Sequence, residues 1–203
     1  MKIIGKKIIR FTKTTSTQDY AKKIAKKSQS CTIIIAEKQT KGRGRFENLW
    51  NSLKGGLYFS VILKPKIEAK EIPVLTYKMA LAIVATLKRI VAKNYSVLVK
   101  PPNDVIVKCE AWNKKIAGIL TESSINNNKV EWIIIGVGIN INNKIPKNLK
   151  NIAISLKEII SPSISNMKQM FYLQTDDEIT KKNLNIDKIF NEIIRKFVKE
   201  IKA

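Results

Sequence analysis

Apolar residues in this chain gather into short runs that are typical of β-strands. Ile33 to Ala36 are consecutive apolar residues after a polar start, which indicates a buried strand. The run GLYFSVILK (56–64) is rich in aromatic and β-branched residues and predicts a second central strand. KIIRFTKT (7–14) and SVLVK (96–100) have the same character. Together these runs predict a β-sheet.

Other stretches show the spacing of helices. TSTQDYAKKIAKK predicts a short helix that Ser16 or Thr17 can cap and that reaches about residue 27. The segment from Pro73 to Tyr95 predicts a long helix that is apolar over a broad face, so we expect it to be largely buried. The last helix has one apolar face and can be capped by Asn185 or Asp187.

The order of these elements indicates the fold class. KKIAGILTESS (114–124) and KVEWIIIGVGINI (129–141) flank an asparagine-rich stretch, which predicts a hairpin. Residues 143–183 are irregular and polar, with one short helical piece near ISLKEII (154–160). Strands, then a helix, then a hairpin predict an α+β fold with a mixed, largely antiparallel sheet and helices packed on one face. We expect one domain over residues 1–203.

Charge and composition narrow the possible functions. The formal net charge is +22, but only five of the 38 cationic residues are arginine, and lysine is dispersed from residue 2 to residue 202. Faces that bind phosphate usually concentrate their cations, so general composition explains the charge better than a nucleic-acid partner. A basic nucleic-acid-binding module stays open as an alternative. Because histidine is absent, catalysis by Ser-His-Asp or Cys-His and His-dependent zinc sites are excluded.

Cysteine use and hydropathy bear on location. Cys31 and Cys109 have no CxxC spacing, which favours a reduced cytoplasmic protein. No apolar run approaches the length needed to span a bilayer. The first ten residues are basic, but no long apolar stretch or cleavage site follows them, so the sequence does not predict a signal peptide. We therefore expect a cytoplasmic protein without a membrane partner.

Three segments each follow a predicted strand with polar groups: EKQTKGRGR (37–45), KPPND (100–104) and KKIAG (114–118). Strand ends on one sheet can converge on one pocket. In the first segment, two glycines allow a close backbone approach, and Arg43 and Arg45 offer forked donors to carboxylate or phosphate. Such a loop suits a phosphorylated or adenylylated small molecule, or RNA. A lone GRG is weak evidence on its own.

The ordered set of motifs is much more specific. TSTQ, EKQTKGRGR…W.S..GGLYFS, KPPND, KKIAGILTE and IIIGVGININ follow the order and rough spacing of the biotin–protein ligase motifs, so the chain resembles that family from residue 8 to about 142. The resemblance implies the class II synthetase-like biotin/lipoate ligase fold. It also implies ATP-dependent attachment of biotin, through biotinyl-5′-AMP, to a lysine of a carboxylase's biotin carrier domain. ATP and biotin are then substrates, with Mg²⁺ required.

Site residues follow from the resemblance, position by position. It implies biotin contacts from Ser16, Thr17, Gln18, Gln39, Arg43, Gly44, Arg45, Lys115 and Gly118, and nucleotide contacts from Arg43, Arg45, Trp50, Asn103 and Asn140. It implies catalytic roles for Lys115, Arg45 and Asp104, with Lys115 near the biotin carboxyl and α-phosphate and Asp104 as the candidate magnesium ligand. Gly136 and Gly138 would allow close approach. Taken singly, these residues also fit a helix cap, a turn or a bulge.

The chain departs from the family pattern in places. Pro101 replaces the usual tryptophan, FENL (46–49) replaces a basic run, Gln18 replaces asparagine, and Gly56 replaces the asparagine before Leu-Tyr. These changes affect the expected substrate affinity more than the reaction itself. A lipoate–protein ligase is the nearest alternative, but its RR-x-S-GGG loop and its histidine motif are both missing. A degenerate ligase that binds biotin without turnover is a further alternative.

Domain content completes the expectation. Some members of the family begin with a helix-turn-helix repressor domain, which does not fit before a strand that starts by residue 8. Many also end with a small SH3-like domain, for which there is no room after Ala203. The sequence thus predicts a monofunctional ligase with no specific DNA partner and a possible homodimer.

Overall fold

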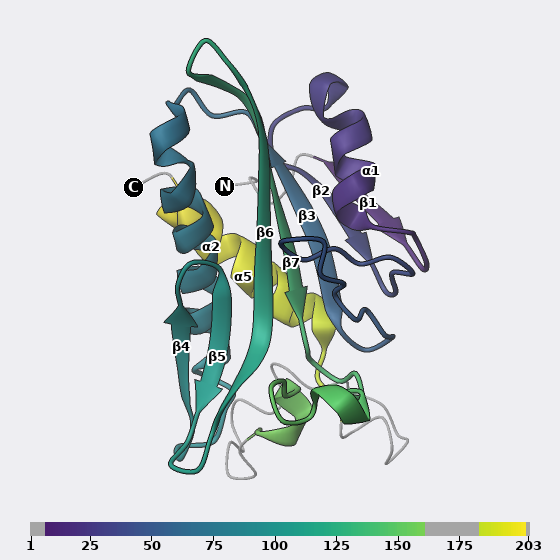
Figure 1. Cartoon of the computed structure of the whole chain (residues 1–203), viewed down its shortest axis with the longest axis vertical. Helices are drawn as coiled ribbons and strands as arrows, with labels where there is room; N and C mark the ends of the chain where they lie inside the picture. The colour runs from purple at the N-terminus through teal and green to yellow at the C-terminus, as the bar shows by residue number, and fades with distance from the viewer. Residues whose placement is uncertain (1–6, 161–182, 202–203) are drawn as a thin grey trace.

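Seven strands form one mixed sheet in the computed structural model, which describes residues 7–160 and 183–201. The strand order is β1-β2-β3-β7-β6-β5-β4 (Figure 1), and of the strand pairs in these residues only β1–β2 is parallel. The strands are β1 (Lys7–Phe11), β2 (Thr32–Ala36), β3 (Leu57–Leu63), β4 (Ser96–Lys100), β5 (Asp104–Lys108), β6 (Asn113–Asn126) and β7 (Lys129–Ile139). The predicted mixed, largely antiparallel sheet is confirmed.

The predicted hairpin is the long β6–β7 pair at the centre of Figure 1. Its turn contains Asn127 and Asn128 with φ of 47° and 62°, the left-handed pair that a two-residue turn requires and that asparagine tolerates. β5 is not among the expected elements. Its short apolar run follows two prolines and ends in a lysine, so the local pattern indicates only a turn.

Helix starts agree with the expected caps. Ser16 caps α1 (Thr17–Ile24) by accepting a hydrogen bond from the Asp19 backbone N–H at 3.3 Å. Asn185 caps α5 (Ile186–Glu200) in the same way. The helical piece expected near residue 157 is a short 3₁₀ turn, Leu156–Glu158. Residues 161–182 of the expected irregular stretch lie outside the described residues.

The long central helix is shorter than expected. α2 (Ile72–Leu87) begins with Pro73 in its first turn but ends before residue 95. Beyond it, the Ala92 backbone N–H donates to the Ile159 carbonyl at 3.1 Å. Between α2 and Ala92, Arg89 and Ile90 donate to Thr86 and Leu87 in the tighter 3₁₀ pattern, and the long-range pairing then replaces helical bonding although the apolar pattern continues.

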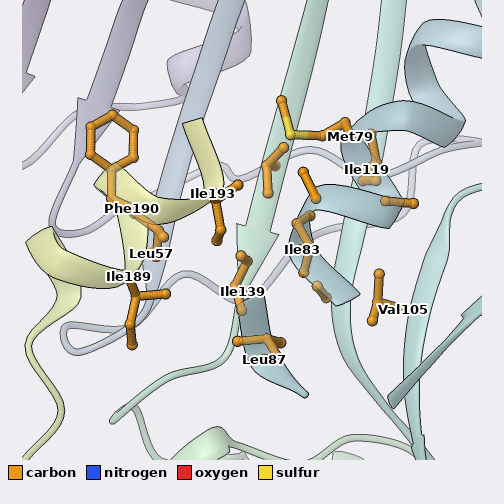
Figure 2. Packing of buried hydrophobic residues seen from close by; sticks show 14 of the residues in the cluster. Leu57, Met79, Ile83, Leu87, Val105, Ile119, Ile139, Ile189, Phe190 and Ile193 are labelled. Atoms are coloured by element: carbon orange, nitrogen blue, oxygen red, sulfur yellow. The ribbon is translucent and has the colours of Figure 1, made fainter. Parts of the chain in front are cut away.

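Helices cover both faces of the sheet, which departs from the expectation of a single covered face. α2 and α5 pack on one face and form the large core in Figure 2. α1 packs on the opposite face, over a smaller cluster that contains Ile34, Ile62 and Ile134. The reason is that β2 and β3 are buried at every position, so both of their faces must be covered. In the part of the chain that is described, no helix is long and apolar enough to cross a membrane.

Candidate active site

A cavity of about 270 Å³ opens on the α1 face of the sheet. Its floor is formed by β3, β6 and β7, and its walls by the start of α1 and the loop at residues 42–52. The cavity is lined by most of the residues singled out in the sequence, namely Ser16, Thr17, Gln18, Gln39, Arg43, Gly44, Arg45, Trp50, Asn103, Asp104, Lys115, Gly118, Gly136 and Gly138. The three polar segments therefore converge as expected.

Glycines leave the floor of the cavity open. Gly118 of β6 pairs with Gly138 of β7, and Gly136 lies two positions further along β7. A Cβ atom on Gly136 would clash with the Gln18 Oε1 atom, and one on Gly138 would clash with the Trp50 Nε1 atom. Larger residues would therefore displace the side chains of Gln18 and Trp50, which lie against the floor.

Hydrogen bonds fix the polar end of the cavity beside α1. The Thr17 backbone N–H and hydroxyl donate to the Gln39 Oε1 atom at 2.7 and 3.1 Å. The Gln39 Nε2 atom donates to the Ser52 hydroxyl at 2.8 Å. Ser60, in β3, lies within hydrogen-bond distance of Thr17 and Gln18. The amide of Gln39 thus has a defined orientation, which suits recognition of a planar polar ligand group.

Charged groups gather at the other end. The Lys115 Nζ atom forms an ion pair with the Asp104 Oδ1 atom at 2.7 Å, and it lies 5.2 Å from the centre of the Trp50 ring. Arg45 donates to the Asn103 Oδ1 atom at 3.1 Å, and the Asn103 Nδ2 atom donates to a β6 carbonyl at 2.8 Å. This end therefore presents cations that are held in place by neighbouring side chains.

A β-bulge in β6 aims Lys115 into the cavity. Val105 pairs with Ala117 and Ile106 pairs with Lys115, which leaves Ile116 as an extra residue without a partner on β5. Ile116 and Ala117 are both fully buried in the core on the α2 side. Regular alternation from Ala117 would place Lys115 in that same core, so the extra residue turns the lysine to the other face.

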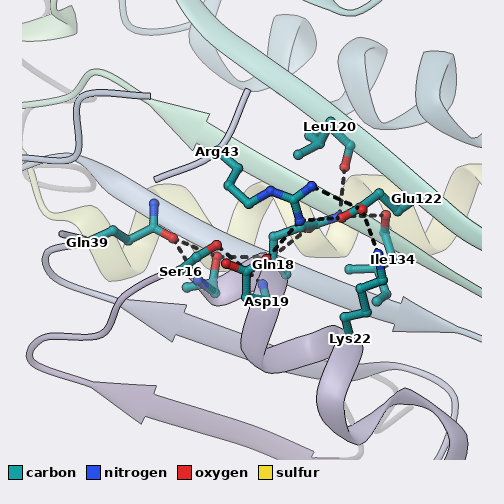
Figure 3. A network of polar contacts seen from close by, with 11 residues as sticks. Ser16, Gln18, Asp19, Lys22, Gln39, Arg43, Leu120, Glu122 and Ile134 are labelled. Atoms are coloured by element: carbon teal, nitrogen blue, oxygen red, sulfur yellow. Dashed lines mark hydrogen bonds and ion pairs between the residues drawn. The ribbon is translucent and has the colours of Figure 1, made fainter. Parts of the chain in front are cut away.

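Arg43 belongs to a polar network beside the cavity, shown in Figure 3. Its guanidinium donates to Asp19 of α1 at 2.8 Å and to Glu122 of β6 at 3.1 and 3.3 Å. Glu122 also accepts hydrogen bonds from Gln18 at 2.9 Å and Lys22 at 3.2 Å. The network therefore ties the loop to α1, which forms a wall of the cavity, and to β6, which forms part of its floor.

Electrostatics keep this network charged. Burial tends to lower the pKa of Arg43, but its hydrogen bonds and charge attraction to Asp19 and Glu122 outweigh burial and raise that pKa. Burial tends to raise the pKa of Glu122, but donors from Gln18, Lys22 and Arg43 outweigh it and lower that pKa. The stability that Glu122 contributes is thus present above its unfolded pKa and is lost as pH falls through its folded pKa.

Two of the expected contact residues are placed differently from the rest. Arg43 lines the cavity, and its guanidinium bonds to Asp19 and Glu122 beside it, so its expected contacts with biotin and nucleotide stay predictions. Asn140 is not among the lining residues. It is 5% exposed, and its side chain accepts a hydrogen bond from Asn143 at 3.0 Å. Its motif lies at the end of β7, where the chain turns away from the cavity floor.

The sequence interpretation misses several residues of the site. Glu122 ends the KKIAGILTE motif, but the motif alone does not show that an arginine from a distant loop reaches it. Ser60 lines the cavity from within a strand whose pattern indicates only burial. Phe46 and Leu49 also line it and are 82% and 80% exposed. The signal for this pair is their place in the glycine-rich loop.

Metal binding by protein side chains alone is not supported. Among residues 7–160 and 183–201, no cluster of three or more His, Cys, Asp or Glu side chains could hold a metal ion. Mg²⁺ is usually held by one or two carboxylates together with substrate phosphates and waters. Asp104 is the acidic residue among the described lining residues, and it fits that limited role.

The sequence is similar to those of known protein ligases. The model of the biotin/lipoate A/B protein ligase family matches residues 8–140. The Bacillus subtilis (strain 168) bifunctional ligase/repressor BirA is 36% identical over 167 residues, which are 80% of this chain and 50% of that protein. A Paracoccus denitrificans biotin–[acetyl-CoA-carboxylase] ligase is 30% identical over 129 residues, 64% of this chain and 52% of that protein. The chain spans about half the length of these relatives.

Solved structures show the same architecture. The biotin protein ligase from Aquifex aeolicus in complex with biotin and ATP is 28% identical and has a TM-score of 0.68, covering 97% of this chain and 71% of that chain. The biotin protein ligase from Leishmania major in complex with biotinyl-5-AMP is 23% identical, with a TM-score of 0.70, covering 97% of this chain and 75% of that chain. The fold class expected from the sequence is thereby confirmed.

Proposed function

The chain belongs to the biotin/lipoate A/B protein ligase family, and from this we propose that it is a biotin–protein ligase. It uses ATP to convert biotin into biotinyl-5′-AMP and then transfers the biotinyl group to one lysine of a biotin carrier domain. The acceptor is a carboxylase, as the name of the Paracoccus relative supports.

The observation that carries this proposal is a single cavity with two chemically different ends. The α1 end offers oriented hydroxyl and amide groups from Thr17, Gln39 and Ser52, which suit a ureido ring. The other end offers Lys115 and Arg45, which suit a carboxylate and a phosphate. Biotin has its ureido ring and its carboxylate at opposite ends, so a molecule of this kind matches the cavity.

In the first step, a carboxylate oxygen of biotin bonds to the α-phosphorus of ATP, and the bond from that phosphorus to pyrophosphate breaks. Two anionic groups must meet, so their repulsion has to be offset. The ammonium of Lys115 and the guanidinium of Arg45 do this from fixed positions. Asp104 holds Lys115 at 2.7 Å, and Asn103 holds Arg45 at 3.1 Å. Asp104 would be the protein ligand of a Mg²⁺ ion bound with the phosphates, and that ion would supply further neutralisation.

In the second step, the unprotonated amine of the carrier lysine attacks the carbonyl carbon of the anhydride. The bond between that carbon and the phosphate oxygen breaks, AMP leaves with the bonding electrons, and the amine loses its extra proton to solvent. Neither step requires an acylated enzyme side chain. The chemistry therefore agrees with a chain that contains no histidine.

Incubation with biotin, Mg-ATP and a carrier domain tests the proposal. Streptavidin blotting should detect biotin on the carrier, and a carrier in which alanine replaces the acceptor lysine should stay unlabelled. A parallel reaction with lipoate and a lipoyl domain distinguishes a biotin–protein ligase from a lipoate–protein ligase, the nearest alternative. Transfer of lipoate alone, or biotin binding without transfer, would contradict the proposal. Salt-sensitive RNA retention without transfer would support the basic binding module.

The remaining expectations stay predictions. A possible homodimer is checked by light scattering at several protein concentrations, and a cytoplasmic location by fractionation of cells. The absence of specific DNA binding is checked by footprinting at physiological salt, because a charge of +22 alone produces weak binding that fades with salt.

Ligand should protect the loop at residues 42–52 from proteolysis. The loop combines glycines and cations with little apolar anchoring, so we expect it to open readily without ligand. Biotin with Mg-ATP should slow tryptic cleavage after Lys41 and Arg45, because a bound adenylate adds contacts to the closed loop. Mass spectrometry of the fragments measures the rate. Equal cleavage with and without ligand would remove this prediction.

A further inference from the structure

One guanidinium joins three separate parts of the site. Arg43 belongs to the loop, Asp19 to α1 and Glu122 to β6, and the pairs are separated by 24 and 79 positions in the sequence. The Arg43 Nη1 atom lies 2.8 Å from the Asp19 carboxylate and 3.1 Å from the Glu122 carboxylate. Figure 3 shows the arginine reaching across to both carboxylates. Arg43 thus fastens the loop to α1 and to β6, in addition to the hydrogen bond from Arg45 to Asn103.

Glu122 anchors more than the loop. Its carboxylate also accepts a hydrogen bond from Gln18 at 2.9 Å, and Gln18 is 3% exposed against Gly136 on the cavity floor. The same carboxylate forms an ion pair with the Lys22 Nζ atom at 3.2 Å. Glu122 therefore connects the loop to the sheet that forms the floor of the site.

The exposure of these groups makes the fastening reversible. The side chain of Arg43 is 37% exposed, that of Asp19 is 41% exposed and that of Glu122 is 20% exposed. Ion pairs that retain this much contact with water stabilise a structure only slightly. A fully buried pair would hold the loop shut, whereas this one closes it and still allows opening.

We propose that Arg43 is a positioning residue that acts as a latch, closing the loop at residues 42–52 over the cavity through Asp19 and Glu122. The inference rests on the proposed ligase function for the identity of the ligand, but not for the latch itself. The latch favours the closed loop before and after the ligand binds. Loss of the guanidinium opens the loop, speeds the release of biotin, and leaves the reacting groups Lys115 and Arg45 in place.

The first test uses the ligand-free protein. Arg43→Met keeps the aliphatic stem of the side chain and removes the guanidinium. It should raise the rate of tryptic cleavage after Lys41 and Arg45 roughly three- to fivefold, which corresponds to the stabilisation that a partly exposed ion pair gives. Lys22→Met is the matched control, because Lys22 contacts Glu122 from α1 and not from the loop. It should leave the cleavage rate unchanged. Thermal unfolding of each variant separates loop opening from a general loss of stability.

The second test separates positioning from catalysis. Arg43→Met should raise KM for biotin in pyrophosphate exchange about three- to fivefold and leave kcat nearly unchanged, as expected for lost ground-state binding. Glu122→Gln leaves the Arg43–Asp19 pair in place, so it should change KM in the same direction and by no more, and the double variant should be no worse than Arg43→Met alone. If Arg43→Met were cleaved at the rate of the parent protein, the latch proposal would be wrong, whatever the activity of the enzyme. A fall in kcat with an unchanged KM would also overturn it, because Arg43 would then act on the reacting groups.

Discussion

Lys115→Ala should slow biotin-dependent pyrophosphate exchange roughly a hundredfold, because loss of one preorganised charged donor costs on the order of 3 kcal/mol in the barrier. Lys115 lines the cavity, and its ammonium is already held by Asp104 at 2.7 Å before charge develops on the phosphate. The fold should survive, because the Asp104 side chain is 26% exposed beside the cavity and removal of the Lys115 head group opens the Asp104 carboxylate to water.

Lys114→Ala is the matched control for this prediction. The Lys114 Nζ atom lies 5.1 Å from the centre of the Trp112 ring, and Lys114 is not among the cavity-lining residues. Its removal should leave the exchange rate close to that of the parent. If Lys114 proved to be the critical residue, or if both variants exchanged at the parental rate, the assignment of Lys115 would have to be abandoned.

Of the substitutions considered, Phe190→Ala should lower the free energy of unfolding most. Phe190 of α5 is fully buried, and its ring meets Phe59 of β3 at a centroid distance of 5.3 Å and an angle of 75° (Figure 2 shows Phe190 in the core). Truncating a buried phenylalanine typically costs about 3–5 kcal/mol, because contacts are lost and a cavity remains. For a chain of this length, the midpoint of thermal unfolding should fall by about 10 °C.

Phe46→Ala makes the same chemical change at an exposed position. Phe46 is 82% exposed, and its ring lies 4.7 Å from the Arg45 guanidinium carbon. Its loss should change the free energy of unfolding by no more than about 1 kcal/mol. Calorimetry of both variants measures the contrast. Similar midpoints for the two would contradict the packing of α5 on β3.

Local patterns predict the elements whose signals lie in contiguous residues. Ser16 and Asn185 are helix caps because their side chains act on residues a few positions away, which a sequence displays directly. The hairpin turn at Asn127 and Asn128 is equally local. The cavity residues are identified through the resemblance to an ordered set of family motifs, and the convergence of three of these segments follows because strand ends meet on one sheet.

Features that depend on distant partners are not predicted in this way. The placement of α1 on the opposite face follows from the need to cover Ile34 and Ile62, which the pattern along one strand does not assign to a side. The ion pairs of Arg43 join residues up to 79 positions apart. The end of α2 before Ala92 depends on a hydrogen bond to Ile159. Each of these outcomes is decided by tertiary contacts rather than by local preference.

The extra residue in β6 has a consequence for comparing related sequences. From Gly118 to Glu122 the even-numbered residues face the cavity side, so counting back in twos from Glu122 selects Lys114 as the cavity lysine. Ile116 reverses this parity, and the odd-numbered Lys115 faces the cavity instead. A relative with the same number of residues here but a regular strand would therefore turn the lysine at position 114, and not the one at 115, toward the cavity. An alignment in which both lysines are retained does not identify the one that faces the cavity, because the bulge and not the residue type decides it.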